Sequence, residues 1–229
     1  TTRSFSENEM SFQKEQEANS LNWSQRAKEH FTTWYRLDAF RQGQSTIDEI
    51  QLSEVGDVKG KKLLHLQCNA GIDTLSWARQ GVDVTGADFS AEAIKLAEQT
   101  KIEVGIPAKF ICCNLYDLKE HLSEPFDVVY TSQGVLCWLR DLKEWAKIIC
   151  HFLRPGGFFY IMEEHPYVIT LDDRANVPQI AKSVQYFHDP DPIWYSDAGA
   201  QGTYEWMWSL ADIVNSLIQA GLEIEFLNE

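Results

Sequence analysis

Short apolar runs of strand length alternate with amphipathic segments along residues 60–165. Four to eight apolar residues bounded by turn residues are typical of a buried strand, and apolar positions three and four apart are typical of a helix. The expected strands are KKLLHLQC (61–68), VDVTGADF (82–89), AKFICCNL (108–115), PFDVVYTS (125–132) and GFFYIMEEHP (157–166). The helices expected between them are GIDTLSWARQG (71–81), SAEAIKLAEQTKIEVG (90–105) and DLKEWAKIICHFLRPGG (141–157).

This alternation predicts an α/β fold in which right-handed helical crossovers join parallel strands, as in a Rossmann-like doubly wound sheet. Local signals support two helix boundaries. Ser90 suits the N-cap of the second helix, and Pro155 with the two glycines after it ends the third.

Residues 1–31 and 166–205 depart from this rhythm. Residues 1–31 are polar with sparse aromatic positions, and we expect an irregular arm that leads into a helix. The next segment, TTWYRLDAFRQG (32–43), predicts a short aromatic helix that stops at Gly43. Residues 166–205 contain four prolines and no sustained period, which predicts an insertion over the carboxyl ends of the strands.

The C-terminal part is expected to form a helix, SLADIVNSLIQAG (209–221), and a strand, LEIEFLNE (222–229). Folds of this kind usually close with one more strand, which suggests that the chain lacks its C-terminus. The sequence is interpreted as a single domain over residues 1–229. Its expected parts are an N-terminal helical cap or lid (1–44), a cofactor-binding core (45–165), the insertion after the fifth strand (166–205) and the C-terminal helix and strand (206–229).

Charge and composition narrow the function classes. With 34 acidic and 20 basic residues the formal net charge is −14, and no basic run is present, which disfavours nucleic acid as a partner. No apolar run approaches 18 residues and no signal peptide is recognisable, so we expect a cytoplasmic protein without a membrane partner. The five cysteines are odd in number and lack a CxxC pair, which predicts neither a disulfide framework nor a metal site.

The turn after the first expected strand is the first place to look for a ligand, because ligands of open α/β sheets lie outside the carboxyl ends of the strands. Residues 67–71 read QCNAG, and Gly71 suits a loop that passes close to a ligand and opens a helix. Asp88 ends the second strand, where a carboxylate can accept both hydrogen bonds of a ribose diol. Each element alone also fits an ordinary β–α turn with a helix-capping aspartate, but together they favour nucleoside binding.

Five segments resemble a known family in their order and spacing: LLHLQCNAG, VTGADFS, FICCNLYDL, FDVVYTSQGVLCWL and LRPGGFFYIMEEHP. They are similar to class I S-adenosylmethionine-dependent methyltransferases, and closest to a bacterial branch whose first motif reads LLHLQC followed by His-Phe-Gly. NAD-dependent Rossmann proteins do not share the LRPGG turn. The resemblance implies the class I methyltransferase fold, S-adenosylmethionine as cofactor, and methyl transfer to a small-molecule acceptor.

The resemblance also implies which residues would meet the cofactor. The implied contacts are Gln67, Cys68, Asn69 and Gly71 along the methionine and ribose portion, Asp88 at the ribose hydroxyls, Phe89 over one adenine face, Asn114 and Leu115 at the adenine edge, and Ser132 and Gln133 under the sulfonium end. For Phe89 the alternative is a core position, and for Cys68 it is a small residue that fills a tight turn.

Four positions depart from the family pattern. The family has an acidic residue where this chain has His65, glycines where it has Gln67 and Asn69, and an aspartate where it has Asn114. The two glycine positions need a backbone conformation that Asn tolerates and Gln tolerates less well. One rival interpretation is therefore a decayed protein that binds a nucleoside without catalysis. A second rival, an NAD(P)-dependent oxidoreductase, would need a G-x-G-x-x-G turn that QCNAGI does not supply.

Methyl transfer from a sulfonium mainly requires that donor and acceptor be aligned and that water be excluded. A general base is needed only if the acceptor carries a proton. His165, which Pro166 holds extended at a strand exit, is the candidate base, and a structural histidine in a turn is the alternative. The candidate acceptor-binding residues are Trp138, Tyr35 and Tyr167, with core packing as the alternative for Trp138. The acceptor, the attacked atom and the oligomeric state stay open.

Overall fold

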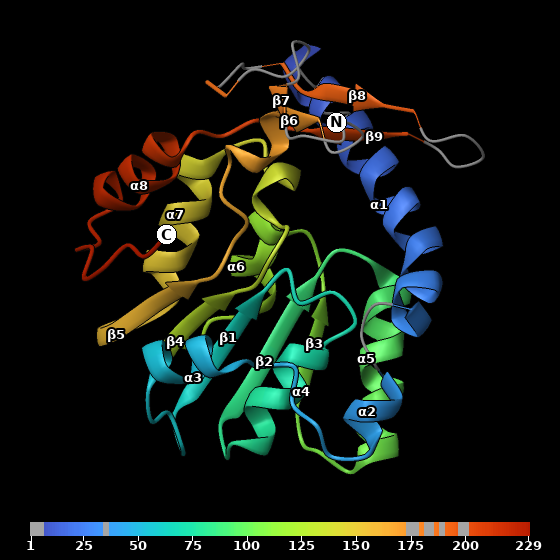
Figure 1. Cartoon of the computed structure of the whole chain (residues 1–229), viewed down its shortest axis with the longest axis vertical. Helices are drawn as coiled ribbons and strands as arrows, with labels where there is room; N and C mark the ends of the chain where they lie inside the picture. Colours follow the sequence, from blue (N-terminus) through green and yellow to red (C-terminus); the bar gives the residue numbers. More distant parts are fainter. Residues whose placement is uncertain (1–6, 34–36, 173–178, 181–185, 188–190, 197–201) are drawn as a thin grey trace, which may run out of the picture.

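A five-stranded parallel sheet forms the centre of the molecule (Figure 1). The computed structural model describes residues 7–33, 37–172, 179–180, 186–187, 191–196 and 202–229. The sheet strands are β1 (Lys62–Leu66), β2 (Asp83–Asp88), β3 (Lys109–Cys112), β4 (Phe126–Thr131) and β5 (Leu153–Ile161). They lie in the order β3-β2-β1-β4-β5, and all neighbouring pairs are parallel. The predicted doubly wound α/β sheet is confirmed.

Helices cover both faces of this sheet. The described helices are α1 (Glu7–Thr33), α2 (Leu37–Arg41), α3 (Glu49–Val55), α4 (Ile72–Arg79), α5 (Ala91–Val104), α6 (Leu118–His121), α7 (Leu142–Phe152) and α8 (Leu210–Gln219). The four helices predicted by periodicity are α4, α5, α7 and α8. The expected N-cap is also present, because the Ser90 hydroxyl accepts the Ala93 N–H at 3.2 Å. The short helices α3 and α6 carried no periodic signal.

The side chains of β1 pack alternately into two separate hydrophobic cores. Leu64 and Leu66 pack in the core shared with α7 and α8, whereas Leu63 packs in the core shared with α3 and α4. The strand order reverses between β1 and β4, so the chain leaves their carboxyl ends toward helices on opposite faces. A doubly wound sheet forms its ligand crevice at this point.

The N-terminal segment is a long helix, α1 (Glu7–Thr33), and the prediction of an irregular arm is wrong for the described residues 7–31. The helix packs against α5 and against strand β9 (Thr203–Glu205). Its buried positions include polar side chains such as Glu15 and Asn19. Because the packed face is not an apolar stripe, hydrophobic periodicity carries no signal for this helix.

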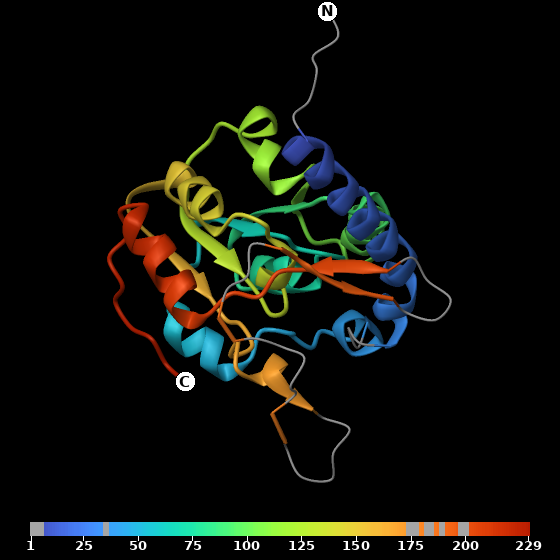
Figure 2. The ribbon, with the colours of Figure 1, turned by 90° about the horizontal axis from the view of Figure 1, so that it is seen from above.

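The described parts of residues 166–205 form two small antiparallel ribbons. One pairs β6 (Leu171–Asp172) with β7 (Gln179–Ile180), and the other pairs β8 (Ile193–Tyr195) with β9. Seen from above, the β8–β9 ribbon crosses the sheet beside α1 (Figure 2). We call α1 together with the β8–β9 ribbon the cover.

Residues 222–229 are outside the sheet, so the prediction of a strand there is wrong. A strand needs a neighbour for its backbone groups, and this segment pairs with none of the described strands. Side chains hold it instead: Asn228 Nδ2 donates to Glu54 Oε1 at 2.6 Å, and Glu229 Oε1 lies 2.7 Å from His165 Nε2.

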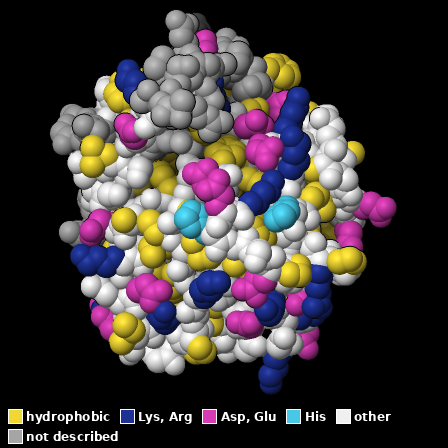
Figure 3. Space-filling view, turned by 180° about the vertical axis from the view of Figure 1, so that it is seen from behind, with side chains coloured by type: hydrophobic (Ala, Val, Ile, Leu, Met, Phe, Trp, Pro, Cys, Tyr) yellow, Lys and Arg dark blue, Asp and Glu magenta, His cyan; other side chains and the backbone are white. Residues whose placement is uncertain are grey.

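The outer surface mixes both signs of charge. On the face shown in Figure 3, acidic and basic side chains are interspersed among the residues drawn in colour, with apolar groups between them. The net charge of −14 is therefore not collected into one patch on that face. Of the helices in the described part of the chain, none combines the length and apolar character needed to cross a bilayer.

Gly71 is fixed by backbone geometry and by packing at the start of α4. Its φ of +70° lies in the left-handed region. A Cβ at this position would lie 2.6 Å from Phe110 Cε1 and 2.9 Å from Ala97 Cβ. Gly71 therefore packs closely against the core, and a side chain at this position would clash with Phe110.

Replacing Gly71 by alanine should destabilise the protein by about 3 kcal/mol, because the left-handed backbone costs about 1–2 kcal/mol and the overpacking adds to it. Gly105→Ala is the matched control, since Gly105 has φ +65° and open space where a Cβ would lie. Its expected cost is about 1 kcal/mol. Urea denaturation followed by circular dichroism measures both free energies of unfolding. Equal losses would show that the contact with Phe110 does not constrain the loop.

Candidate cofactor and active site

The loop after β1 adopts an uncommon backbone conformation. Gln67 has φ +55° and Asn69 has φ +48°, so with Gly71 three alternate residues are left-handed. The expectation that the glycine positions of the family need such a conformation is confirmed. Asparagine adopts it readily, whereas for glutamine it is sterically unfavourable.

Asp88, at the end of β2, ties this loop to the next helix. Its Oδ2 accepts the Asn69 N–H and its Oδ1 accepts the Ser90 N–H, both at 2.8 Å. The carboxyl group is buried, and burial raises its pKa to about 6 against the opposing effect of the backbone amides. Each carboxylate oxygen can accept a further hydrogen bond, as a ribose diol requires.

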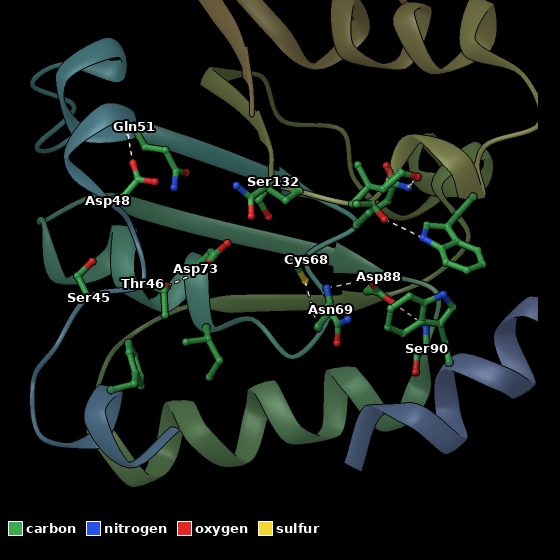
Figure 4. Close-up of a pocket in the computed structure, with 18 of the residues that line it drawn as sticks. Ser45, Thr46, Asp48, Gln51, Cys68, Asn69, Asp73, Asp88, Ser90 and Ser132 are labelled. Carbon is green, nitrogen blue, oxygen red and sulfur yellow. Dashed lines mark hydrogen bonds between the residues drawn. The ribbon is translucent and has the colours of Figure 1, made fainter. Parts of the chain in front are cut away.

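A cavity of about 550 Å³ opens at the carboxyl ends of β1, β2 and β4 (Figure 4). Seven of the ten predicted cofactor residues line it: Gln67, Cys68, Asn69, Asp88, Phe89, Ser132 and Gln133. A smaller cavity of about 50 Å³ lies beneath α1 and is lined by Asn114 and Leu115. The two cavities share Gln67, Asp88 and Phe89, so they form adjoining parts of one site.

Asn114 is partly engaged before any ligand arrives. Its Oδ1 accepts the Tyr116 N–H at 3.0 Å and caps a short 3₁₀ turn, Leu115–Asp117. Asn114 also lines the smaller cavity. Gly71 is the one predicted cofactor residue that lines neither cavity.

The residues predicted for catalysis and acceptor binding are dispersed. Trp138 lines both cavities, and its Nε1 donates to the Gly134 carbonyl at 2.8 Å. His165 lines neither: its Nε2 faces Glu229, and its Nδ1 accepts the Tyr167 N–H at 3.1 Å. The structure thus does not bring His165 or the half-exposed Tyr167 into the site. Tyr35 lies outside the described residues.

Glu163 is a residue of this region that the sequence analysis did not single out. Its carboxylate, just after β5, accepts the backbone N–H of Val135 at 2.9 Å, of Leu136 at 3.2 Å and of Gly134. It therefore holds the loop after β4, which carries Ser132, Gln133 and Trp138, against the carboxyl edge of the sheet. A glutamate directly after a buried strand was the available signal.

Two further residues near the first motif were also missed as site residues. Asp73, in the first turn of α4, lines the larger cavity. His65 is buried behind it, and burial lowers the pKa of its imidazole to about 3, so the ring is neutral. The cysteine at the site is not activated: burial raises the pKa of the Cys68 thiol well above its ordinary value.

The polar groups of the cavity fit a cationic nucleoside such as S-adenosylmethionine. The buried oxygens Gln67 Oε1 and Asn69 Oδ1 have no hydrogen-bond partner among the described residues, and each requires a donor. The described charged residues that line the larger cavity are all acidic: Asp48, Asp73, Asp88 and Glu164. S-adenosylmethionine brings hydroxyl and ammonium donors and a sulfonium charge, so the site and this cofactor are complementary.

Comparison with known proteins agrees with this geometry. Residues 64–161 match a family model described as a methyltransferase domain. A ubiquinone biosynthesis O-methyltransferase from Photorhabdus laumondii is 28% identical over 131 residues, which are 56% of this chain and 54% of that protein. The chain thus spans about half the length of the curated relatives it matches.

Solved structures share the fold. A TehB-like S-adenosylmethionine-dependent methyltransferase from Corynebacterium glutamicum has a TM-score of 0.57 at 19% identity, covering 87% of this chain and 85% of its own. DhpI in complex with S-adenosylhomocysteine also has a TM-score of 0.57, at 16% identity, covering 89% and 87%. Fold, motif order and family match agree. The chain therefore has the fold of class I S-adenosylmethionine-dependent methyltransferases, and its residues 64–161 are similar to a methyltransferase domain.

Proposed function

We propose that this protein transfers the methyl group of S-adenosylmethionine to a small-molecule acceptor. The observation that carries the proposal is the cavity at the carboxyl ends of β1, β2 and β4, where seven residues expected at the cofactor converge around Asp88. Its lining favours a ligand with hydroxyl donors and positive charge.

The chain's own residues bind and orient the cofactor in this proposal. Asp88 accepts the ribose hydroxyls while it keeps its two backbone amides. Phe89 and Leu115 border the adenine, and Asn114 donates its amide N–H to the adenine edge. Glu163 fixes the loop that places Ser132 and Gln133 near the sulfur.

The cofactor supplies an activated methyl group, so the protein mainly aligns the acceptor with it. In the transfer, an acceptor lone pair forms the new bond to the methyl carbon while the carbon–sulfur bond breaks. Trp138, at the junction of the two cavities, borders the space for the acceptor. Removal of an acceptor proton is not assigned to His165, because its ring nitrogens contact Glu229 and the Tyr167 amide instead.

The curated relatives suggest the first acceptors to test. Those considered above are named as O-methyltransferases of ubiquinone biosynthesis, so hydroxylated aromatic compounds form the first panel. Anionic acceptors are disfavoured, because the described charged residues of the larger cavity are carboxylates.

Cofactor choice provides the direct test. Calorimetry should show binding of S-adenosylhomocysteine and no measurable binding of NAD, because the turn lacks the glycines that cradle a pyrophosphate. Transfer of a radiolabelled methyl group to a hydroxylated acceptor should then be detectable. Comparable affinity for NAD would overturn the cofactor assignment. Binding without transfer to any member of a broad panel would instead support a binding protein that has lost catalysis.

The raised pKa of Asp88 predicts a pH dependence. Ribose hydroxyls donate to the charged carboxylate, so protons compete with the ligand. Affinity for S-adenosylhomocysteine should fall about tenfold per unit below pH 6 and stay level above pH 7. Asp88→Asn should weaken binding about 10- to 100-fold at pH 8 and abolish the slope. Calorimetry between pH 5 and 8 measures both, with melting curves as the folding control; a slope that survives in the variant would assign it to another group.

The N-terminal 44 residues are proposed to act as a lid through α1. Phe12 and Asn19 line the smaller cavity from this helix, and Asn19 exchanges two 2.8 Å hydrogen bonds with the backbone of Tyr204. Adding S-adenosylhomocysteine should slow amide exchange in α1 and β9, because a closed site protects what covers it. Hydrogen exchange mass spectrometry tests this, with α8 as the internal control. Unchanged exchange in α1 would make it a permanent packing element.

A further inference from the structure

Asp73 is a cavity carboxylate that the cofactor contacts proposed above do not use. It lies in the first turn of α4, directly after the left-handed loop that ends at Gly71. Its Oδ1 accepts the Thr46 hydroxyl at 2.6 Å. Thr46 is itself held by Ser76, whose Oγ accepts the Thr46 N–H at 3.2 Å and lies 3.0 Å from the Thr46 hydroxyl. The carboxylate is therefore held in place by a segment 27 residues away in the sequence.

His65 cannot supply a negative charge to the part of the site next to Asp73. The family pattern has an acid there, but the imidazole is neutral and both of its nitrogens have hydroxyl partners. Nδ1 lies 2.8 Å from Thr74 Oγ1, and Nε2 lies 3.1 Å from Ser132 Oγ. The Ser132 hydroxyl also interacts with Asp73, where it lowers the pKa of the carboxyl group against the larger, raising effect of burial.

Asp73 and Asp88 lie on opposite sides of the loop residues Cys68 and Asn69 (Figure 4). With the ribose at Asp88, a ligand that runs along the loop reaches Asp73 with its other end. The unpartnered oxygens Gln67 Oε1 and Asn69 Oδ1 belong to the same loop. The loop between the two aspartates therefore offers further hydrogen-bond acceptors.

The other acidic residues that line the cavity are engaged or exposed. Asp48 Oδ1 accepts the Gln51 N–H at 2.8 Å and caps α3, and Asp88 holds two amides. Glu164 is exposed beside β5. A partly buried carboxylate such as Asp73 is stabilised when a cation pairs with it, and the methionine portion of the cofactor carries an ammonium group.

We propose that Asp73 binds the α-ammonium group of the methionine portion, with Thr46 as its positioning residue, in place of an acid at His65. This inference rests on the proposed function. In this proposal Asp73, on α4, binds the charged amino-acid end of the ligand, and Asp88 binds its nucleoside end.

The test compares two ligands that share one nucleoside. S-adenosylhomocysteine carries the amino-acid portion, and 5′-methylthioadenosine lacks it. By calorimetry, Asp73→Asn should weaken S-adenosylhomocysteine binding about 10- to 100-fold, the range for losing a hydrogen bond to a charged group, and leave methylthioadenosine within about twofold. Thr46→Val should weaken the first ligand by a smaller factor and spare the second.

Asp48→Asn is the matched control, because it removes one carboxylate from the same cavity and asparagine caps a helix as well as aspartate does. It should change neither affinity by more than about threefold. A deaminated analogue of S-adenosylhomocysteine completes the comparison: it should bind wild type and Asp73→Asn equally.

Three outcomes would overturn the inference. Asp73→Asn could leave S-adenosylhomocysteine binding unchanged, or it could weaken both ligands alike. A loss of the same size in Asp48→Asn would indicate a general effect of cavity charge. If wild type binds neither ligand, the proposed function itself fails and this assignment fails with it. Thr46→Val gives the same comparison without altering the carboxylate, should Asp73→Asn fail to fold.

Discussion

The site depends on one buried carboxylate that joins three parts of the chain. Asp88 ends β2, accepts an amide from the loop after β1 and accepts another at the start of α5. The left-handed residues Gln67 and Asn69 are kept in that loop partly by this bond, since the backbone conformation alone is unfavourable for glutamine. Burial of the charge is costly, as its raised pKa shows. The buried charge lies at the carboxyl edge of the sheet, where the proposed ligand binds.

The parallel sheet and its crossover helices follow from the alternation of strand-length segments that contain apolar residues with amphipathic helical segments. The nucleoside end of the site follows from the rule that ligands collect at carboxyl ends of strands, together with the position of Asp88. Three things needed tertiary information. The packing face of α1 is mostly polar, His165 pairs with the side chain of Glu229, and Glu163 acts through backbone amides of another loop. The first two leave no local pattern, and Glu163 is marked only by its position just after β5.

The acidic lining of the larger cavity bears on the proposed methyl transfer. A sulfonium donor carries one more positive charge than the thioether product, so carboxylates around the cavity favour the donor over the product. The excess of acidic residues over the whole chain is a separate property, since charges on the face shown in Figure 3 are interspersed with basic groups. Of the acidic residues that line the larger cavity, the buried Asp88 is the one that salt screens least.

The pairing of Asn19 with Tyr204 has a consequence for how the chain folds. These residues are 185 positions apart, whereas the contacts of the central sheet join segments much closer in sequence. Contacts with large sequence separation carry the greater loop-closure entropy and form late. The β1–β5 sheet can therefore assemble first, and the pairing of α1 with β9 forms as the last step. If only the pairing of α1 with β9 breaks, the site opens to solvent while the central sheet stays folded. Ligand can then exchange at a lower free-energy cost than global unfolding requires.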